Sequence, residues 1–168
     1  DHRDLHSFPT RRSSDLSKGF RAPSFSLNIT SSWLIDILEE NDYVYDSSIV
    51  PAKTSLYGIP NAEKKPYKIS SKFLEGNSND GKIIEFPMMV TKFLGKKIPA
   101  VGGFYLRTPP PRIIEHAIKT DEKENLPEVG YIHSLELTPE FMPKMKLSKK
   151  DNSITFHHMD KAYHKMKD

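Results

Sequence analysis

The fold class is decided by residues 17–51, which read SKGFRAPSFSLNITSSWLIDILEENDYVYDSSIVP. Apolar side chains at helical spacing predict an amphipathic helix that begins near Trp33 and ends at Asn41. Residues 19–25 suit the end of a strand, and residues 43–49 are aromatic and β-branched, which favours a second strand. Strand, helix and strand within ~30 residues indicate a βαβ unit with parallel pairing. The apolar positions assigned to this helix are Trp33, Leu34, Ile37 and Leu38, and its expected cap is Thr30 or Ser31.

The alternation of strands and helices continues after this unit. Residues 50–82 are rich in Pro, Gly, Asn, Lys and Ser, which predicts loops with short strands. Residues 83–87 and residues 128–132 favour strands, and three prolines followed by RIIEHAIK predict a helix that ends near Lys119. This order argues for an α/β layer or barrel architecture.

Composition excludes several function classes. The chain has 168 residues, which fits one domain or a piece of a larger one. Its 25 Lys and Arg against 22 Asp and Glu give a net charge of +3, too even a balance to predict a nucleic-acid partner. No apolar run is long enough to predict a membrane span. The chain has no cysteine, so disulfides, thiolate metal sites and cysteine nucleophiles are excluded.

The first sixteen residues do not resemble the rest of the chain. Residues 6–16, HSFPTRRSSDL, closely resemble one reading frame of a common sequencing adapter. We interpret residues 1–16 as an assembly artefact and expect them to be disordered. His2 and His6 have the spacing of a helical metal pair, but the artefact is the favoured explanation.

Three side chains stand at the ends of predicted strands, where α/β folds build their sites. Arg21 can orient a carboxylate through a charge-assisted pair, or it is a structural arginine of the surface. His133 can act as a general acid or base, or it is a core histidine with its hydrogen bonds satisfied. Asp46 can tune a nearby histidine, although a turn or cap is the more common use of such an aspartate.

Several separated motifs occur in a recognisable order. They are GFRAPSFS (19–26), YVYDSSIVP (43–51), YGIPNA (57–62), IIEFPMMV (83–90), PAVGGFYLR (99–107) and YIHSLEL (131–137). Together they closely resemble polysaccharide deacetylases of the NodB-homology group (carbohydrate esterase family four), and within it the exosortase-associated branch. The resemblance implies part of a distorted (β/α) barrel without its first strands, followed by a loop-rich C-terminal extension. It also implies hydrolysis of N-acetyl groups on an envelope or exported polysaccharide with a divalent metal, usually zinc.

The resemblance also implies roles for individual residues. RAPSF looks like the family's arginine motif, so that Arg21 would hold the catalytic base, Pro23 would line the groove and the Ser24 backbone N–H would stand at the oxyanion position. YIHSLEL looks like the last motif, which makes His133 the general acid that protonates the leaving amine. Asp46 lies near the family's fourth motif, whose aspartate tunes that histidine.

Two features of the family pattern are missing from this chain. The TFDDG-like strand, which carries the base and one metal ligand, and the HSxxH metal pair both precede the arginine motif in the family, and neither is present here. We therefore expect residues 17–168 to be the C-terminal part of a polysaccharide N-deacetylase, with no metal ligand of its own and inactive as it stands. The alternative is a non-catalytic remnant that still binds an N-acetylated polysaccharide.

Overall fold

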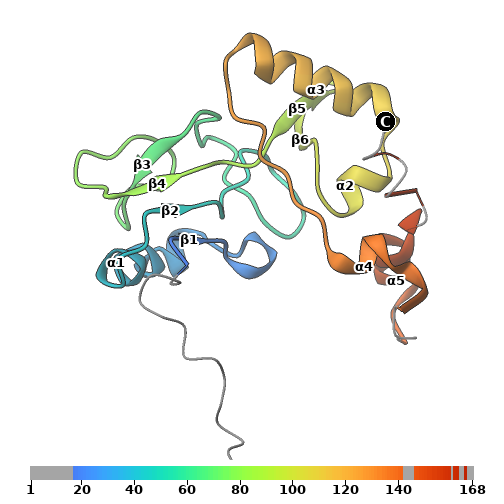
Figure 1. Ribbon diagram of the computed structural model, residues 1–168, viewed down its shortest axis with the longest axis horizontal. Coiled ribbons are helices and arrows are strands. Elements are labelled where there is room, and N and C mark those ends of the chain that lie inside the picture. Colours follow the sequence, from blue (N-terminus) through green and yellow to red (C-terminus); the bar gives the residue numbers. More distant parts are fainter. Residues whose placement is uncertain (1–16, 142–145, 160, 163–164, 166–168) are drawn as a thin grey trace, which may run out of the picture.

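The computed structural model describes residues 17–141, 146–159, 161–162 and 165, so residues 1–16, interpreted above as an artefact, lie outside it. The described chain is a mixed α/β structure with a four-stranded sheet and a separate two-stranded hairpin (Figure 1). The strands of the sheet are β1 (Gly19–Phe20), β2 (Tyr45–Asp46), β3 (Tyr67–Ile69) and β4 (Ile83–Glu85). Their order across the sheet is β1-β2-β4-β3.

The predicted βαβ unit is confirmed. β1 pairs in parallel with β2, in the register Gly19 to Tyr45 and Phe20 to Asp46. Helix α1 (Trp33–Glu40) connects them and ends at Asn41, as the sequence indicates. β2 is much shorter than the predicted strand over residues 43–49, because the backbone beyond Asp46 leaves the ladder and the Ile49 N–H donates to the Glu85 carboxyl at 2.9 Å.

The buried face of α1 matches the predicted one in part, because Leu38 is buried and Leu34 packs against the core. Ile35 and Leu38 are buried, whereas Trp33 is 58% exposed and Ile37 is also exposed. Residues three apart share a helix face, and the position of the sheet selects the Ile35 and Leu38 stripe over the neighbouring one. The expected cap is wrong as well, because the N-cap of α1 is Ser32, which makes no side-chain cap hydrogen bond. Thr30 and Ser31 belong to a preceding 3-10 turn, η3 (Ile29–Ser31), which Asn28 caps through its side chain.

The barrel expectation is not confirmed. The described residues form an open sheet and no closed barrel. β2 pairs in parallel with β4, but β3 pairs with β4 in the antiparallel sense and ends the sheet on that side. The strands of the sheet are only two or three residues long. Buried side chains of the sheet pack with Ile35 and Leu38 of α1 to form the main hydrophobic core.

The second half of the structure gathers around the hairpin of β5 (Val90–Phe93) and β6 (Lys96–Pro99). The sequence also predicts an extended segment over residues 98–106. The structure confirms only its first residues, which belong to β6, and helix α2 (Phe104–Arg107) takes up its end. Helix α3 (Pro111–Lys123) starts on a proline as predicted and runs four residues past the predicted end at Lys119. Ala117 of α3 packs against the buried residues that flank the hairpin.

After α3 the chain crosses back toward the sheet, without the strand predicted over residues 128–132 (Figure 1). This segment makes one backbone bond to the hairpin side, from the Met89 N–H to the Val129 carbonyl at 3.0 Å. The remaining described elements are α4 (Ser134–Leu137), η4 (Pro139–Phe141) and α5 (Lys149–Phe156). No helix within the described segments is long and apolar enough to span a membrane.

Candidate functional site

A cavity of about 530 Å³ opens beside the irregular segment over residues 126–133, which leads from α3 to α4. Its wall is built from the loop after β1, the loop over residues 54–57, helix α2, the start of α4 and the end of α5. Hydroxyl and aromatic groups dominate the wall, among them the side chains of Ser24, Tyr57, Tyr105, Tyr131 and His133. The cavity therefore brings together Ser24 and His133, which are 109 positions apart in the chain.

Ser24 reaches the cavity on a strained turn. Ser24 and Phe25 have φ angles of 55° and 52°, in the left-handed region that residues other than glycine seldom adopt. Phe25 is buried, and its ring lies 5.2 Å from the ring of Tyr57 and 5.1 Å from that of Tyr131. Aromatic packing of Phe25 thus holds the turn in place. Pro23 precedes Ser24 in this turn and is exposed.

Arg21 lies behind the turn. Its Nε donates to the Ser47 carbonyl at 2.8 Å, and its Nη2 donates to Ser47 Oγ at 2.7 Å. The guanidinium carbon also lies 5.6 Å from the centre of the Phe25 ring. These contacts connect the loop after β1 to the loop after β2. Arg21 therefore stabilises the loop that carries Ser24 and is not itself part of the cavity wall.

Asp46 lies in the core and not on the cavity wall. It is fully buried in β2, and its Oδ1 accepts a hydrogen bond from Ser48 Oγ at 2.7 Å. Ser48 Oγ in turn accepts from the Ala22 N–H at 2.7 Å, which connects Asp46 to the turn over residues 21–25, called the arginine turn below. The structure thus brings Asp46 close to the Arg21 loop and pairs it with Glu85, not with His133.

Asp46 and Glu85 form a buried carboxyl pair. Burial raises the pKa of both groups, and the charge of Asp46 raises the pKa of Glu85 further, although hydrogen bonds to each carboxylate partly offset the effect. Oδ2 of Asp46 and Oε2 of Glu85 receive no N–H or O–H from the described residues. A proton held between the two carboxyls satisfies both oxygens, and the raised pKa of Glu85 favours this protonated form of the pair.

His133 stands at the entrance to α4. Its side chain is exposed on the cavity wall, and its ring lies 5.2 Å from that of Tyr131 in an edge-on arrangement at 79°. It does not emerge from a buried strand, because the preceding segment is irregular. An exposed imidazole at a cavity wall can give a proton to a bound molecule or take one from it.

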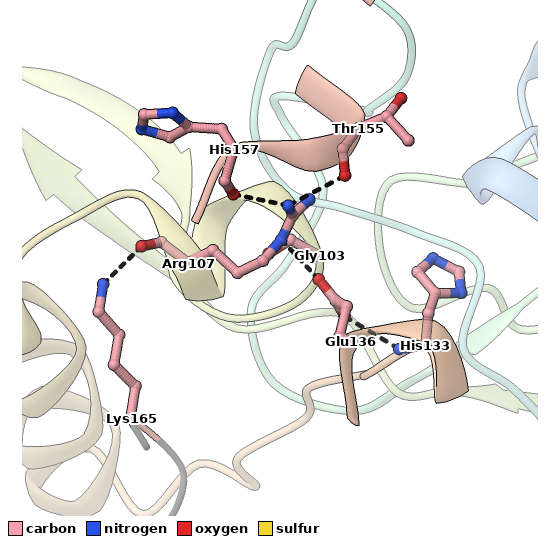
Figure 2. Close-up of polar contacts among 7 residues, drawn as sticks. All are labelled: Gly103, Arg107, His133, Glu136, Thr155, His157 and Lys165. Carbon is pink, nitrogen blue, oxygen red and sulfur yellow. Dashed lines mark hydrogen bonds and ion pairs between the residues drawn. The ribbon is translucent and has the colours of Figure 1, made fainter. Parts of the chain in front are cut away.

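Two buried charges beside His133 were missed as site residues in the sequence. Arg107 Nε lies 2.7 Å from Glu136 Oε1, and both side chains are almost fully buried (Figure 2). The other oxygen, Oε2, accepts from the His133 backbone N–H at 3.0 Å. One sequence signal for this contact exists, because a glutamate three residues after a helix cap often accepts from the backbone N–H of the cap.

The tyrosines give the cavity its chemical character. Burial raises the pKa of Tyr57, Tyr105 and Tyr131, so all three phenols stay protonated over the physiological range. Their rings offer flat apolar surface and their hydroxyls can donate and accept hydrogen bonds, a combination that suits a polyhydroxylated ring. Tyr131 packs directly over Gly102, where a Cβ would stand 2.2 Å from the Tyr131 ring.

Metal ligands do not gather within the described part of the chain. No three His, Asp or Glu side chains in those segments are close enough together to hold an ion. The His, Asp and Glu side chains of those segments thus do not fit the zinc that the resemblance implies.

Fold and cavity together define a mixed α/β domain with an aromatic, hydroxyl-lined cavity. The chain belongs to the family described as "Domain of unknown function (DUF3473)", whose model matches residues 47–168. No curated protein and no solved structure matches the chain. His133 and the Arg107–Glu136 ion pair lie inside the matched region, whereas the arginine turn precedes it.

Proposed function

We propose that this chain is part of a polysaccharide N-deacetylase and supplies its sugar-binding cavity and its proton donor. The observation that carries the proposal is the single cavity shared by the Ser24 turn and His133, whose motifs are far apart in the sequence. The resemblance to NodB-type deacetylases predicts that both motifs act on one substrate, the Ser24 N–H at the oxyanion position and His133 as the general acid. The assignment of residues 17–168 to such an enzyme stays a prediction.

The roles of the chain's own residues follow from their positions. The three cavity tyrosines bind the sugar ring by stacking and hydrogen bonding. Ser24 lines the cavity, and in this proposal its backbone N–H stabilises the oxygen of the acetamide carbonyl as negative charge develops there. Water adds to the acetamide carbonyl carbon and gives a proton to the base that the missing part of the family pattern would supply. As the C–N bond breaks, the protonated His133 imidazole gives its proton to the nitrogen, so that acetate and the free amine are released.

Arg21 and Asp46 support this arrangement from behind the wall. Arg21 fixes the loop that carries Ser24 through its two bonds to Ser47. Asp46 is buried with Glu85, so we assign it to the framework of the arginine turn and not to proton transfer. Pro23 borders Ser24 at the exposed edge, where a polysaccharide chain would pass.

Binding of sugars tests the proposal directly. The unaltered chain is titrated with tetra-N-acetylchitotetraose and with the fully deacetylated tetramer by calorimetry, and we expect preference for the acetylated ligand. Tyr131→Ala should abolish that preference because it removes a cavity wall, whereas Tyr45→Ala, which removes an exposed ring from β2, should not. Equal binding of both ligands, or no binding at all, would refute the proposal.

The alternative function is a carbohydrate-binding domain without catalysis, which the absence of a gathered ligand set among the described residues favours. Acetylated-sugar binding without acetate release is expected of the isolated chain under both functions. Genomic sequencing across the codons for residues 1–17 separates them. An in-frame TFDDG-like segment and an HSxxH pair upstream support the deacetylase, and their absence supports the binding domain.

A further inference from the structure

One carboxylate connects the cavity histidine to a buried arginine. Glu136 uses Oε2 to accept from the His133 backbone N–H at 3.0 Å and Oε1 to pair with Arg107 Nε at 2.7 Å. Figure 2 shows Glu136 between the two residues, with the His133 ring turned away from the ion pair. The two oxygens therefore connect α2 directly to the backbone at the start of α4.

Arg107 is itself anchored on a third element. Its Nη1 donates to the backbone carbonyls of Thr155 at 3.1 Å and His157 at 2.7 Å, at the end of α5 (Figure 2). The side chains of Arg107 and Glu136 are only 5% and 3% exposed. An ion pair at such burial holds its two charges together, because removing one partner leaves an uncompensated charge in the interior.

The segment that delivers His133 has little regular structure of its own. Residues 126–133 have no helix or strand, and the Val129 carbonyl accepts one backbone bond from Met89. The helix that follows is only four residues long. A short helix after an irregular segment does not fix its first residue strongly, so the position of His133 depends on side-chain contacts such as the one to Glu136.

We propose that Arg107 and Glu136 are positioning residues that hold His133 at the cavity wall. The ion pair aims Glu136 at the His133 N–H, and the bonds from Arg107 to the Thr155 and His157 carbonyls fix the ion pair relative to the end of α5, which also lines the cavity. The purpose of this positioning rests on the proposed function, in which His133 meets the nitrogen of an N-acetylated sugar. Neither Arg107 nor Glu136 needs to touch the reacting atoms.

Hydrogen exchange of the His133 amide tests the positioning without any ligand. Arg107 makes no direct bond to this amide, yet Arg107→Met should speed its exchange roughly ten-fold, because Glu136 without its partner leaves the buried position. Lys64→Met is the matched control, since Lys64 forms two ion pairs of 3.0 Å, with Asp121 and Glu124, away from His133. Exchange at His133 that is equal in the unaltered chain and in Arg107→Met would overturn the proposal.

A rescue variant separates positioning from general loss of stability. In the double variant Arg107→Met with Glu136→Gln, the amide oxygen of the new residue can accept from the His133 N–H with no charge left buried. We expect slow exchange to return at His133. If Arg107→Met does not fold, Glu136→Gln alone tests the same proposal. Its single amide oxygen must then serve both the Arg107 side chain and the His133 N–H, so we expect the His133 amide to exchange faster than in the unaltered chain. Full protection there would overturn the proposal.

Ligand titration then tests what the positioning is for. Arg107→Met should weaken binding of tetra-N-acetylchitotetraose at least roughly ten-fold, and the double variant should recover most of that loss. Faster exchange with unchanged affinity would overturn the link to ligand binding. If the unaltered chain binds no sugar, the proposed function fails, while the exchange comparison still decides whether Arg107 and Glu136 position His133.

Discussion

Replacing Glu85 with glutamine should stabilise the protein at neutral pH. Glu85 is fully buried, its Oε1 accepts from the Ile49 N–H at 2.9 Å, and its Oε2 faces Asp46 with no other donor among the described residues. A glutamine of the same shape keeps the bond to Ile49 and presents an N–H to Asp46. It therefore reproduces the protonated form of Glu85 without the need to bind a proton.

The size of the gain follows from the cost of keeping a carboxyl protonated. Burial and the neighbouring Asp46 charge raise the pKa of Glu85 well above its ordinary value of 4.5. The folded protein then binds more protons than the unfolded chain, so this part of the stability is complete below pH 4.5 and is lost as the pH rises toward the folded-state pKa. Between these two pKa values, the bound proton changes the free energy of unfolding by about 1.4 kcal/mol per pH unit.

Urea unfolding of the two proteins at a series of pH values between 4 and 8 measures this difference. We expect nearly equal stability at pH 4 and an advantage for Glu85→Gln that grows toward neutral pH. Glu122→Gln makes the same change of charge at an exposed position of α3 and should show no such trend. An advantage that is constant across the series, or a loss of stability at pH 7, would refute the idea of a shared proton.

Three further changes test the framework of the cavity. Gly102→Ala places a methyl group 2.2 Å from the Tyr131 ring at a φ of 109°, and we expect a loss of about 2 kcal/mol or more in urea unfolding, against a smaller loss for Gly95→Ala, where no atom lies within 4 Å. Ser24→Gly relieves a φ of 55° and should raise the free energy of unfolding by up to about 1 kcal/mol, and a clear decrease would mean that the turn is not strained. Ile35→Ala empties a fully buried position of α1 and should cost about 2 to 5 kcal/mol, so a cost below about 1 kcal/mol would contradict its place in the core.

Local sequence patterns were sufficient to predict the elements whose formation depends on residues close together in the chain. The βαβ unit follows from helical spacing between two β-rich stretches, and the start of α3 follows from prolines ahead of a helical run. These features depend on backbone sterics and on contacts within a few residues, which a sequence displays directly. The resemblance also located His133 and Ser24, which line one cavity.

The buried ionic contacts could not be read from the sequence. Asp46 stands at the end of a strand, where α/β folds often place site residues. In the structure it is buried in the core and pairs with Glu85, which is 39 positions away in the chain. Arg107 and Glu136 meet only because the chain crosses back after α3. Burial and the nearest charge set the state of such groups, and both depend on which distant segments pack together.

The sequence by itself determined the α/β class, the helix boundaries near Asn41 and Pro111, and the motifs that meet at the cavity. The tertiary structure decided which face of α1 is buried, that the sheet is open, and that Asp46 is buried in the core and does not line the cavity. The reason is that local sterics act through neighbours in the chain, whereas burial, strand order and ion pairing are set by contacts between residues far apart in it.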